Sequence, residues 1–109
     1  MTAEDTRRNA PRKAIRCQVM IAFSGAAPMR ARTKDISLGG ICVMVPEQLA
    51  TGRPCMVMFE ASLNGKMVQV TGVAKVIYSI LSGTEGFRTG LQFVQIDAAN
   101  TKTLTDLMA

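Results

Sequence analysis

The chain lacks histidine and tryptophan, and it has only one tyrosine and four phenylalanines among its 109 residues. Histidine is the usual general base and a common zinc ligand, so its absence removes the most frequent centre of acid–base and zinc chemistry. The few carboxylates are scattered along the sequence, which predicts no paired acid and base. We therefore expect no catalytic residues and no metal site, and we do not expect an enzyme.

Cysteine is also scarce, and its pattern is uninformative for metal binding. Cys17, Cys42 and Cys55 are odd in number and have no CxxC spacing, which indicates small buried thiols of a reducing compartment. No apolar run follows the charged first residues as in a signal peptide, and none approaches the roughly 20 residues of a membrane-spanning helix. We expect a cytoplasmic protein that does not insert into a membrane.

Positive charge is present in excess, and it is concentrated at one end. The formal net charge is +5, and the first sixteen residues hold five arginines and lysines against Glu4 and Asp5. A basic segment beside a nearly neutral body indicates a local anion site. Pro11 disfavours helical geometry in the residue before it, so we interpret residues 1–13 as a flexible arm. Residues 14–109 are then expected to form one folded domain.

Beyond the arm the hydrophobic pattern has a period of two, which is typical of half-buried strands. We expect six strands, at residues 15–23, 29–36, 41–45, 55–59, 67–78 and 87–93. The odd-numbered residues of the first strand should face inward, and Val76 and Tyr78 should share the inner face of the fifth. The pattern predicts an all-β fold, a six-stranded antiparallel β-barrel.

Three short signals add detail to this fold. Asn64-Gly65 is typical of a type I′ hairpin turn, because both residues tolerate a positive φ. Gly72 interrupts the fifth strand and indicates a bulge or a corner. Asp97 is a predicted N-cap for a C-terminal α-helix over residues 98–108, whose leucines form one apolar stripe.

Two polar clusters have the chemistry to bind a ligand. Arginines of the arm can grip phosphates or the Hoogsteen edge of guanine. The segment Asp35–Gly40 ends a strand in a turn, where a carboxylate can accept hydrogen bonds from guanine N1–H and N2–H₂ and where glycines permit unusual backbone conformations. Taken singly, they are also explained as a solvated tail and an ordinary turn. The candidate ligand-binding residues are Arg7, Arg8, Arg12, Asp35, Ser37, Gly39 and Gly40.

The two clusters in this order resemble the PilZ domain family. The residues that match its RxxxR and [D/N]xSxxG motifs are Arg8, Arg12, Asp35, Ser37 and Gly40. The segment Gly90-Leu91-Gln92-Phe93 also resembles the last strand of the family. The resemblance covers nearly the whole chain and implies a PilZ-like barrel that is a receptor for cyclic di-GMP, with no other cofactor.

The resemblance also implies how such a receptor would act. The arginines of the arm would hold guanines and phosphates, and the turn would hold a guanine. A chain of one domain has no output module, so we expect the ligand-ordered arm to signal to an unidentified downstream protein. Arg7 adds a further cation and planar group, which predicts an intercalated ligand dimer, about two ligands per chain.

Two other functions are compatible with the composition. A small basic barrel could bind nucleic acid, but such proteins stack bases on exposed aromatic side chains, and the four phenylalanines fall on apolar strand faces. We therefore expect no DNA or RNA partner. A scaffold without a ligand could use the methionines as an adaptable surface, although we expect most of those in strands to fill the core.

Overall fold

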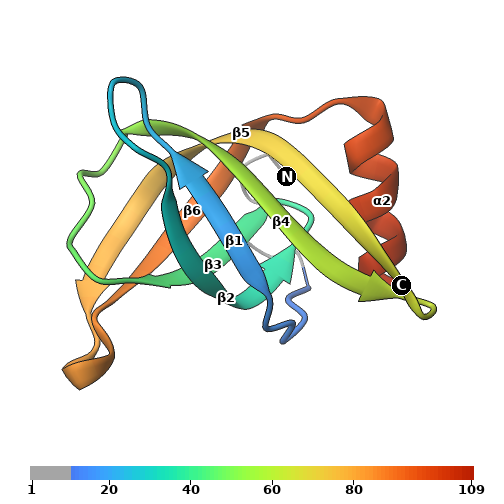
Figure 1. The fold of residues 1–109 in the computed structure, drawn as a ribbon, viewed down its shortest axis with the longest axis horizontal. Coiled ribbons are helices and arrows are strands. Elements are labelled where there is room, and N and C mark those ends of the chain that lie inside the picture. The colour runs from blue at the N-terminus through green and yellow to red at the C-terminus, as the bar shows by residue number, and fades with distance from the viewer. Residues whose placement is uncertain (1–10) are drawn as a thin grey trace.

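Six antiparallel strands close a barrel in the order β1-β2-β3-β6-β5-β4 in a computed structural model, which describes residues 11–109 (Figure 1). The elements are β1 (Gln18–Ala22), β2 (Met29–Ser37), β3 (Gly40–Val45), β4 (Pro54–Leu63), β5 (Lys66–Leu81), the short 3-10 helix η1 (Gly83–Glu85), β6 (Phe87–Gln95) and α2 (Ala98–Met108). The predicted fold class, an all-β six-stranded barrel with a C-terminal helix, is confirmed.

The barrel is filled by the inward residues of every strand. Val19, Ile21 and Phe23 are buried, as the alternation predicted, and large fully buried side chains such as Phe59 and Leu91 come from the other strands. Burial of each such side chain contributes roughly 1.5–3 kcal/mol. The expectation that strand methionines fill the core is wrong, because these methionines are half-buried or exposed. They are Met20, Met44, Met56, Met58 and Met67.

The β4–β5 hairpin is the most regular part of the barrel. Its strands pair without interruption from Pro54↔Lys75 to Leu63↔Lys66, and the turn has φ values of 52° at Asn64 and 82° at Gly65. The predicted type I′ turn is confirmed. Both strands are longer than predicted, because alternation of exposed and buried residues continues after the apolar run ends at Phe59.

The first strand is shorter than predicted and begins at Gln18. Ile15 and Cys17 still pack against the core, but the side chain of Thr33 replaces part of the backbone ladder there. Its Oγ1 donates to the Ile15 carbonyl at 2.6 Å and accepts from the Cys17 N–H at 2.9 Å. Of the other two cysteines, Cys55 is buried in the core, and burial raises the pKa of its thiol to about 11.

Helix α2 packs beside β5 and β4, near the β4–β5 hairpin and far from η1 (Figure 1). Asp97 caps it as predicted, because its carboxylate accepts from the Asn100 N–H at 2.8 Å. Asn100 in turn accepts from the Thr71 N–H at 2.9 Å, which ties the first turn to β5. Leu104 and Leu107 bury the apolar stripe. No helix within residues 11–109 is long and apolar enough to cross a membrane.

Candidate functional site

A β-bulge in β2 determines the direction of Asp35. The register with β3 shifts between Thr33 and Asp35, so Lys34 is an extra residue. Thr33 is buried before the bulge and Ile36 is buried after it, so Asp35 faces outward although it has the same parity as Thr33. Bulges often re-aim side chains in this way next to functional sites. The sequence signal is the pair of charged residues, Lys34-Asp35, between inward positions.

A second bulge, in β5, turns Tyr78 outward. The register with β6 shifts between Val76 and Tyr78, so Ile77 is the extra residue. Val76 and Ser79 are both buried, which leaves Ile77 and Tyr78 on the outer face. The prediction that Tyr78 shares the inner face with Val76 is therefore wrong. The other register shift, between Val73 and Ala74, has its extra residue, Val94, on β6, so it is not the bulge in β5 that Gly72 suggested.

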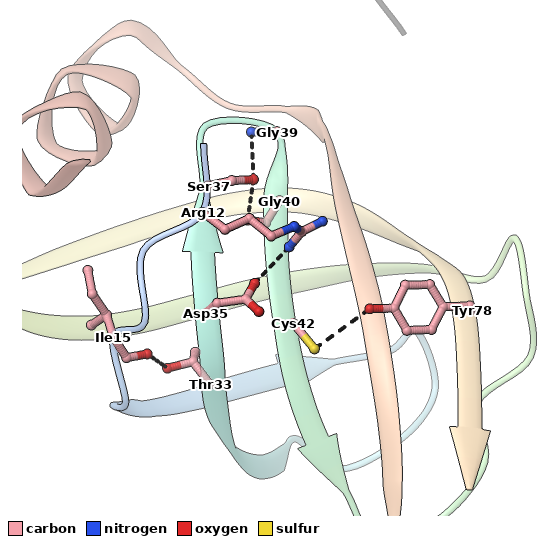
Figure 2. Close-up of polar contacts among 9 residues, drawn as sticks. All are labelled: Arg12, Ile15, Thr33, Asp35, Ser37, Gly39, Gly40, Cys42 and Tyr78. Atoms are coloured by element: carbon pink, nitrogen blue, oxygen red, sulfur yellow. Dashed lines mark hydrogen bonds and ion pairs between the residues drawn. The ribbon is translucent and has the colours of Figure 1, made fainter. Parts of the chain in front are cut away.

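The two bulges place four residues in one row on the outer side of the barrel, where Cys42 and Gly90 are buried and Asp35 and Tyr78 are half-buried. In order across β2, β3, β6 and β5, the row consists of Asp35, Cys42, Gly90 and Tyr78. The Tyr78 hydroxyl donates to the Cys42 sulfur at 3.7 Å (Figure 2). Burial, and then the bond to Cys42, raises the pKa of Tyr78. The phenol therefore stays protonated at neutral pH, with its ring fixed over the middle of the row.

Gly90 makes this ring position possible. A Cβ at residue 90 would collide with the Tyr78 ring, so the aromatic ring lies directly on the glycine backbone. In the sequence, the signal for Gly90 is its place in the last-strand motif Gly90-Leu91-Gln92-Phe93. Tyr78 itself was missed as a site residue, and its only signal was three successive large apolar residues, Val76-Ile77-Tyr78, which break the alternation.

Arg12 is the one predicted arginine of the arm that lies within the described residues, and it contacts the row. Its Nη1 donates to Asp35 Oδ1 at 2.7 Å, as Figure 2 shows, with 48% of the Arg12 side chain and 22% of the Asp35 side chain exposed. Such a half-exposed pair contributes only about 0–1 kcal/mol to stability. Arg7 and Arg8 lie outside the described residues.

The adjacent Lys13 fixes the end of the arm to the barrel. Its N–H donates to the Ile36 carbonyl at 2.8 Å, and its own carbonyl accepts from the Ile36 N–H at 2.9 Å. Its ammonium donates to the carbonyls of Leu107 and Ala109, at 3.1 and 3.3 Å, at the C-terminal end of α2. Lys13 thus links the segment that carries Arg12 to both the motif strand and the helix.

Ser37, Gly39 and Gly40 form the predicted turn, but not in the predicted way. Ser37 is buried, and its hydroxyl donates to the Gly40 carbonyl at 3.2 Å and accepts from the Gly39 N–H at 3.3 Å. The Ser37 hydroxyl therefore holds the turn together from inside and is not exposed. Neither glycine has a positive φ. Gly40 is required instead because a Cβ there would collide with the Leu91 carbonyl oxygen of β6.

A hollow of about 380 Å³ lies on the barrel surface beside the row. Its polar and aromatic lining includes Arg12, Ser37, Gly39, Tyr78 and Gln92. This size suits a small-molecule site. A larger hollow of about 540 Å³ lies between Lys13, the β4–β5 hairpin and the end of α2, but it offers neither an arginine nor an aromatic ring.

The hollow beside the row is therefore the better site for a planar anion. Of the predicted residues, Arg12, Ser37, Gly39 and Gly40 line it together with Tyr78, and Asp35 adjoins it through its ion pair with Arg12. Within residues 11–109, no group of three or more cysteine, aspartate and glutamate side chains is placed to hold a metal ion.

Comparisons with known proteins agree with this fold. Bacillus subtilis MotI/DgrA, an inhibitor of motility, superposes with a TM-score of 0.78 at 20% identity, covering 93% of this chain and 50% of that chain. The PilZ domain of Escherichia coli YcgR, solved with c-di-GMP, gives 0.67 at 15% identity, with 93% and 88% covered. The PilZ domain of CeSA from a cellulose-synthesizing bacterium gives 0.61 at 21% identity, with 90% and 94% covered.

These structures define the class of the domain, a small closed antiparallel barrel with a helix after its last strand. A family model described as "PilZ domain" matches residues 6–109. The chain belongs to the PilZ domain family. It spans half the length of the Bacillus subtilis protein, and no curated protein matches it.

Proposed function

We propose that this chain is a receptor for cyclic di-GMP that binds the ligand over the row of outward residues between Asp35 and Tyr78. The observation that carries the proposal is the pairing of Arg12 with Asp35 on that row, beside a hollow with an aromatic side chain. The YcgR domain of the same fold was solved with c-di-GMP. A dinucleotide with two guanines and two phosphates needs the same groups: a guanidinium, a carboxylate and a planar surface.

Each residue has a role that follows from its chemistry. The Asp35 carboxylate can accept from guanine N1–H and N2–H₂, and adenine does not offer this pair of donors. Arg12 is already oriented by Asp35, so it can grip a phosphate or a guanine edge without first being ordered. Tyr78 provides a face on which a base can stack, and Ser37 and Gly40 keep the turn backbone close to the hollow.

The finer parts of the proposal involve the arm. Arg8 would provide the second grip of RxxxR, and Arg7 would meet the outer face of an intercalated ligand dimer, giving about two ligands per chain. Ordering of the arm by the ligand would present a changed surface to a downstream protein. Lys13 supports this coupling, because it connects the segment next to Arg12 with the end of α2.

Isothermal titration calorimetry tests the proposal directly. We expect cyclic di-GMP to bind more tightly than cyclic di-AMP, and Arg7→Leu to lower the stoichiometry toward one. Single-stranded DNA, titrated at two salt concentrations, tests the nucleic-acid alternative, because phosphate-driven binding weakens steeply with salt. Absence of heat with cyclic di-GMP at two temperatures, or equal affinity for DNA, would exclude the proposed receptor function.

A further inference from the structure

A second outward row runs beside the proposed ligand row and is not used by it. In order across β2, β3, β6 and β5, this row consists of Arg32, Met44, Arg88 and Ile80. Arg32 and Arg88 are exposed, Met44 is half-buried, and Ile80 is 60% exposed. Arg16 and Lys34 adjoin the row at its β2 side, where they line a hollow of about 200 Å³ together with Arg32 and Met44. We call these six residues the basic–apolar face.

The positive charge of the basic–apolar face is not neutralised within residues 11–109. The ion pairs among residues 11–109 are Arg12–Asp35 and Lys102–Asp106. None of the four cations of the face takes part in either pair; they are Arg16, Arg32, Lys34 and Arg88. Glu85 is the one carboxylate that lines the hollow beneath Arg32 and Lys34. Four cations against one anion make this face attractive to a negatively charged partner.

The apolar side chains at this face are also exposed to solvent. Ile80 and the adjacent Leu81, 65% exposed, line a second hollow of about 350 Å³ with Arg88 and Tyr78. Single exposed aliphatic residues are common on protein surfaces. Two of them in one hollow beside an arginine form a mixed site, which suits a partner with an apolar anchor among acidic residues.

The geometry favours a protein segment over a membrane or a nucleic acid. The hairpin tip beyond Leu81 consists of Ser82–Gly86 and includes Glu85, so a bilayer would meet a polar, acidic turn before it reached Ile80. Nucleic acids would use the arginines but gain little from aliphatic side chains, because they are bound by phosphate contacts and aromatic stacking.

We propose that the basic–apolar face is a docking site for an acidic protein segment that carries an aliphatic or aromatic anchor. The anchor occupies the hollow of Ile80 and Leu81, and the carboxylates pair with Arg32 and Arg88. The site does not depend on the proposed ligand. Tyr78 lines both the ligand hollow and the hollow of Ile80, so the two sites adjoin at this residue.

Fluorescence anisotropy with the full chain tests the face. The probe is a short labelled peptide that alternates aspartate and glutamate with leucine and phenylalanine, and the matched peptide has asparagine and glutamine in place of the acids. We expect the acidic peptide to bind at least about tenfold more tightly than the neutral one at low salt. Arg32→Glu/Arg88→Glu should reduce that affinity at least about tenfold, and Ile80→Ser should also reduce it.

Control variants keep the outcome decisive. Lys66→Glu/Lys75→Glu makes the same change in net charge elsewhere on β5 and should leave peptide affinity within about twofold. If the charge-reversal variant Arg32→Glu/Arg88→Glu has a lowered melting temperature, the neutral variant Arg32→Gln/Arg88→Gln replaces it in the binding test. Equal binding of the two peptides, or tighter binding of single-stranded DNA or phosphatidylglycerol vesicles, would overturn the proposal. A loss of cyclic di-GMP affinity in Arg32→Gln/Arg88→Gln with unchanged peptide binding would also overturn it, since it would assign the face to the nucleotide.

Discussion

The two sides of β5 differ in regularity. Toward β4 it pairs without a register shift along the whole hairpin, whereas toward β6 its register shifts twice. The β2–β3 pairing on the far side of β6 also shifts. We call the β4–β5 part of the barrel the regular side, and it carries the type I′ turn and helix α2. We call the part formed by β2, β3, β6 and the β6-facing edge of β5 the shifted side, and it carries Asp35, Tyr78 and the candidate site.

This difference decides which side chains reach the outer surface of the barrel. On the regular side, buried positions alternate strictly with exposed or half-buried ones, and the buried side chains are apolar except at Gly72. On the shifted side, strict alternation would bury one more side chain at each bulge, and the bulge moves that side chain to the outer surface. Asp35 and Tyr78 thus lie half-buried on the outer surface, while Ile36 and Ser79 are buried. Variants on the two sides should therefore have different consequences.

The largest expected effect is on stability, from Gly40→Ala compared with Gly65→Ala. A Cβ at Gly40 collides with the backbone of Leu91, so β3 and β6 must separate, and we expect a loss of about 3 kcal/mol or more. At Gly65 the added Cβ meets no atom, and only the φ of 82° is strained, at a cost of about 1–2 kcal/mol. Chemical denaturation measures both. A larger loss in Gly65→Ala would contradict the close approach of β3 and β6.

The next expected effect is on binding, from Arg12→Ala compared with Arg30→Ala. Loss of a charge-assisted hydrogen bond of about 1.5–3 kcal/mol should weaken cyclic di-GMP binding at least tenfold. Arg30 is exposed on β2, the strand that also carries Asp35, but it lines a different hollow, so its variant should bind normally. Neither melting temperature should change much, because the Arg12–Asp35 pair is half-exposed. Equal affinities in the two variants would remove Arg12 from the site.

The contrast between the two sides also explains what could be predicted from the sequence. Periodicity predicted the barrel, the Asn64-Gly65 turn and the Asp97 cap, because each depends on local backbone preference or regular alternation. The motifs predicted Asp35 as a site residue, but Tyr78 was assigned to the wrong face, because a bulge depends on pairing with β6. The requirement for glycine at position 40 could not be predicted either, because it comes from contact with the backbone of Leu91, which is far along the chain.

A smaller effect on binding is expected from Tyr78→Ala compared with Tyr78→Phe. If a guanine stacks on Tyr78, loss of the ring should cost about 1–3 kcal/mol of binding free energy. Tyr78→Phe keeps the ring on Gly90 and loses only the long hydroxyl contact with Cys42, so its affinity should be nearly that of the unmodified chain. Calorimetry distinguishes these results. An equal loss in both variants would show that the hydroxyl, and not the ring, matters.

The smallest expected effect concerns Asp97 on the regular side, and it depends on pH. Hydrogen bonds from Asn100 lower the pKa of Asp97 below its ordinary value of 3.8. A carboxylate with a lowered folded-state pKa stabilises the fold above its unfolded pKa, and this contribution is lost as the pH falls through the folded pKa. Asp97→Ala should therefore melt at a lower temperature than the unmodified chain at neutral pH, and the two melting temperatures should converge below about pH 3.8.

Cyclic di-GMP affinity at neutral pH should be the same in Asp97→Ala, because Asp97 caps α2 and lies outside the residues that line the proposed ligand hollow. Melting followed by circular dichroism over a pH series, with one calorimetric titration at neutral pH, measures both quantities. Asp97→Asn is the matched control, since an asparagine caps a helix without a titrating group. A difference in melting temperature between Asp97→Ala and the unmodified chain that stays constant into acid would show that the ionised form of Asp97 is not what stabilises the cap. A loss of affinity would show instead that the helix and the ligand row are coupled. The contacts of Lys13 with Ile36 and with the end of α2 would then have to transmit the effect of the substitution from the helix to the row.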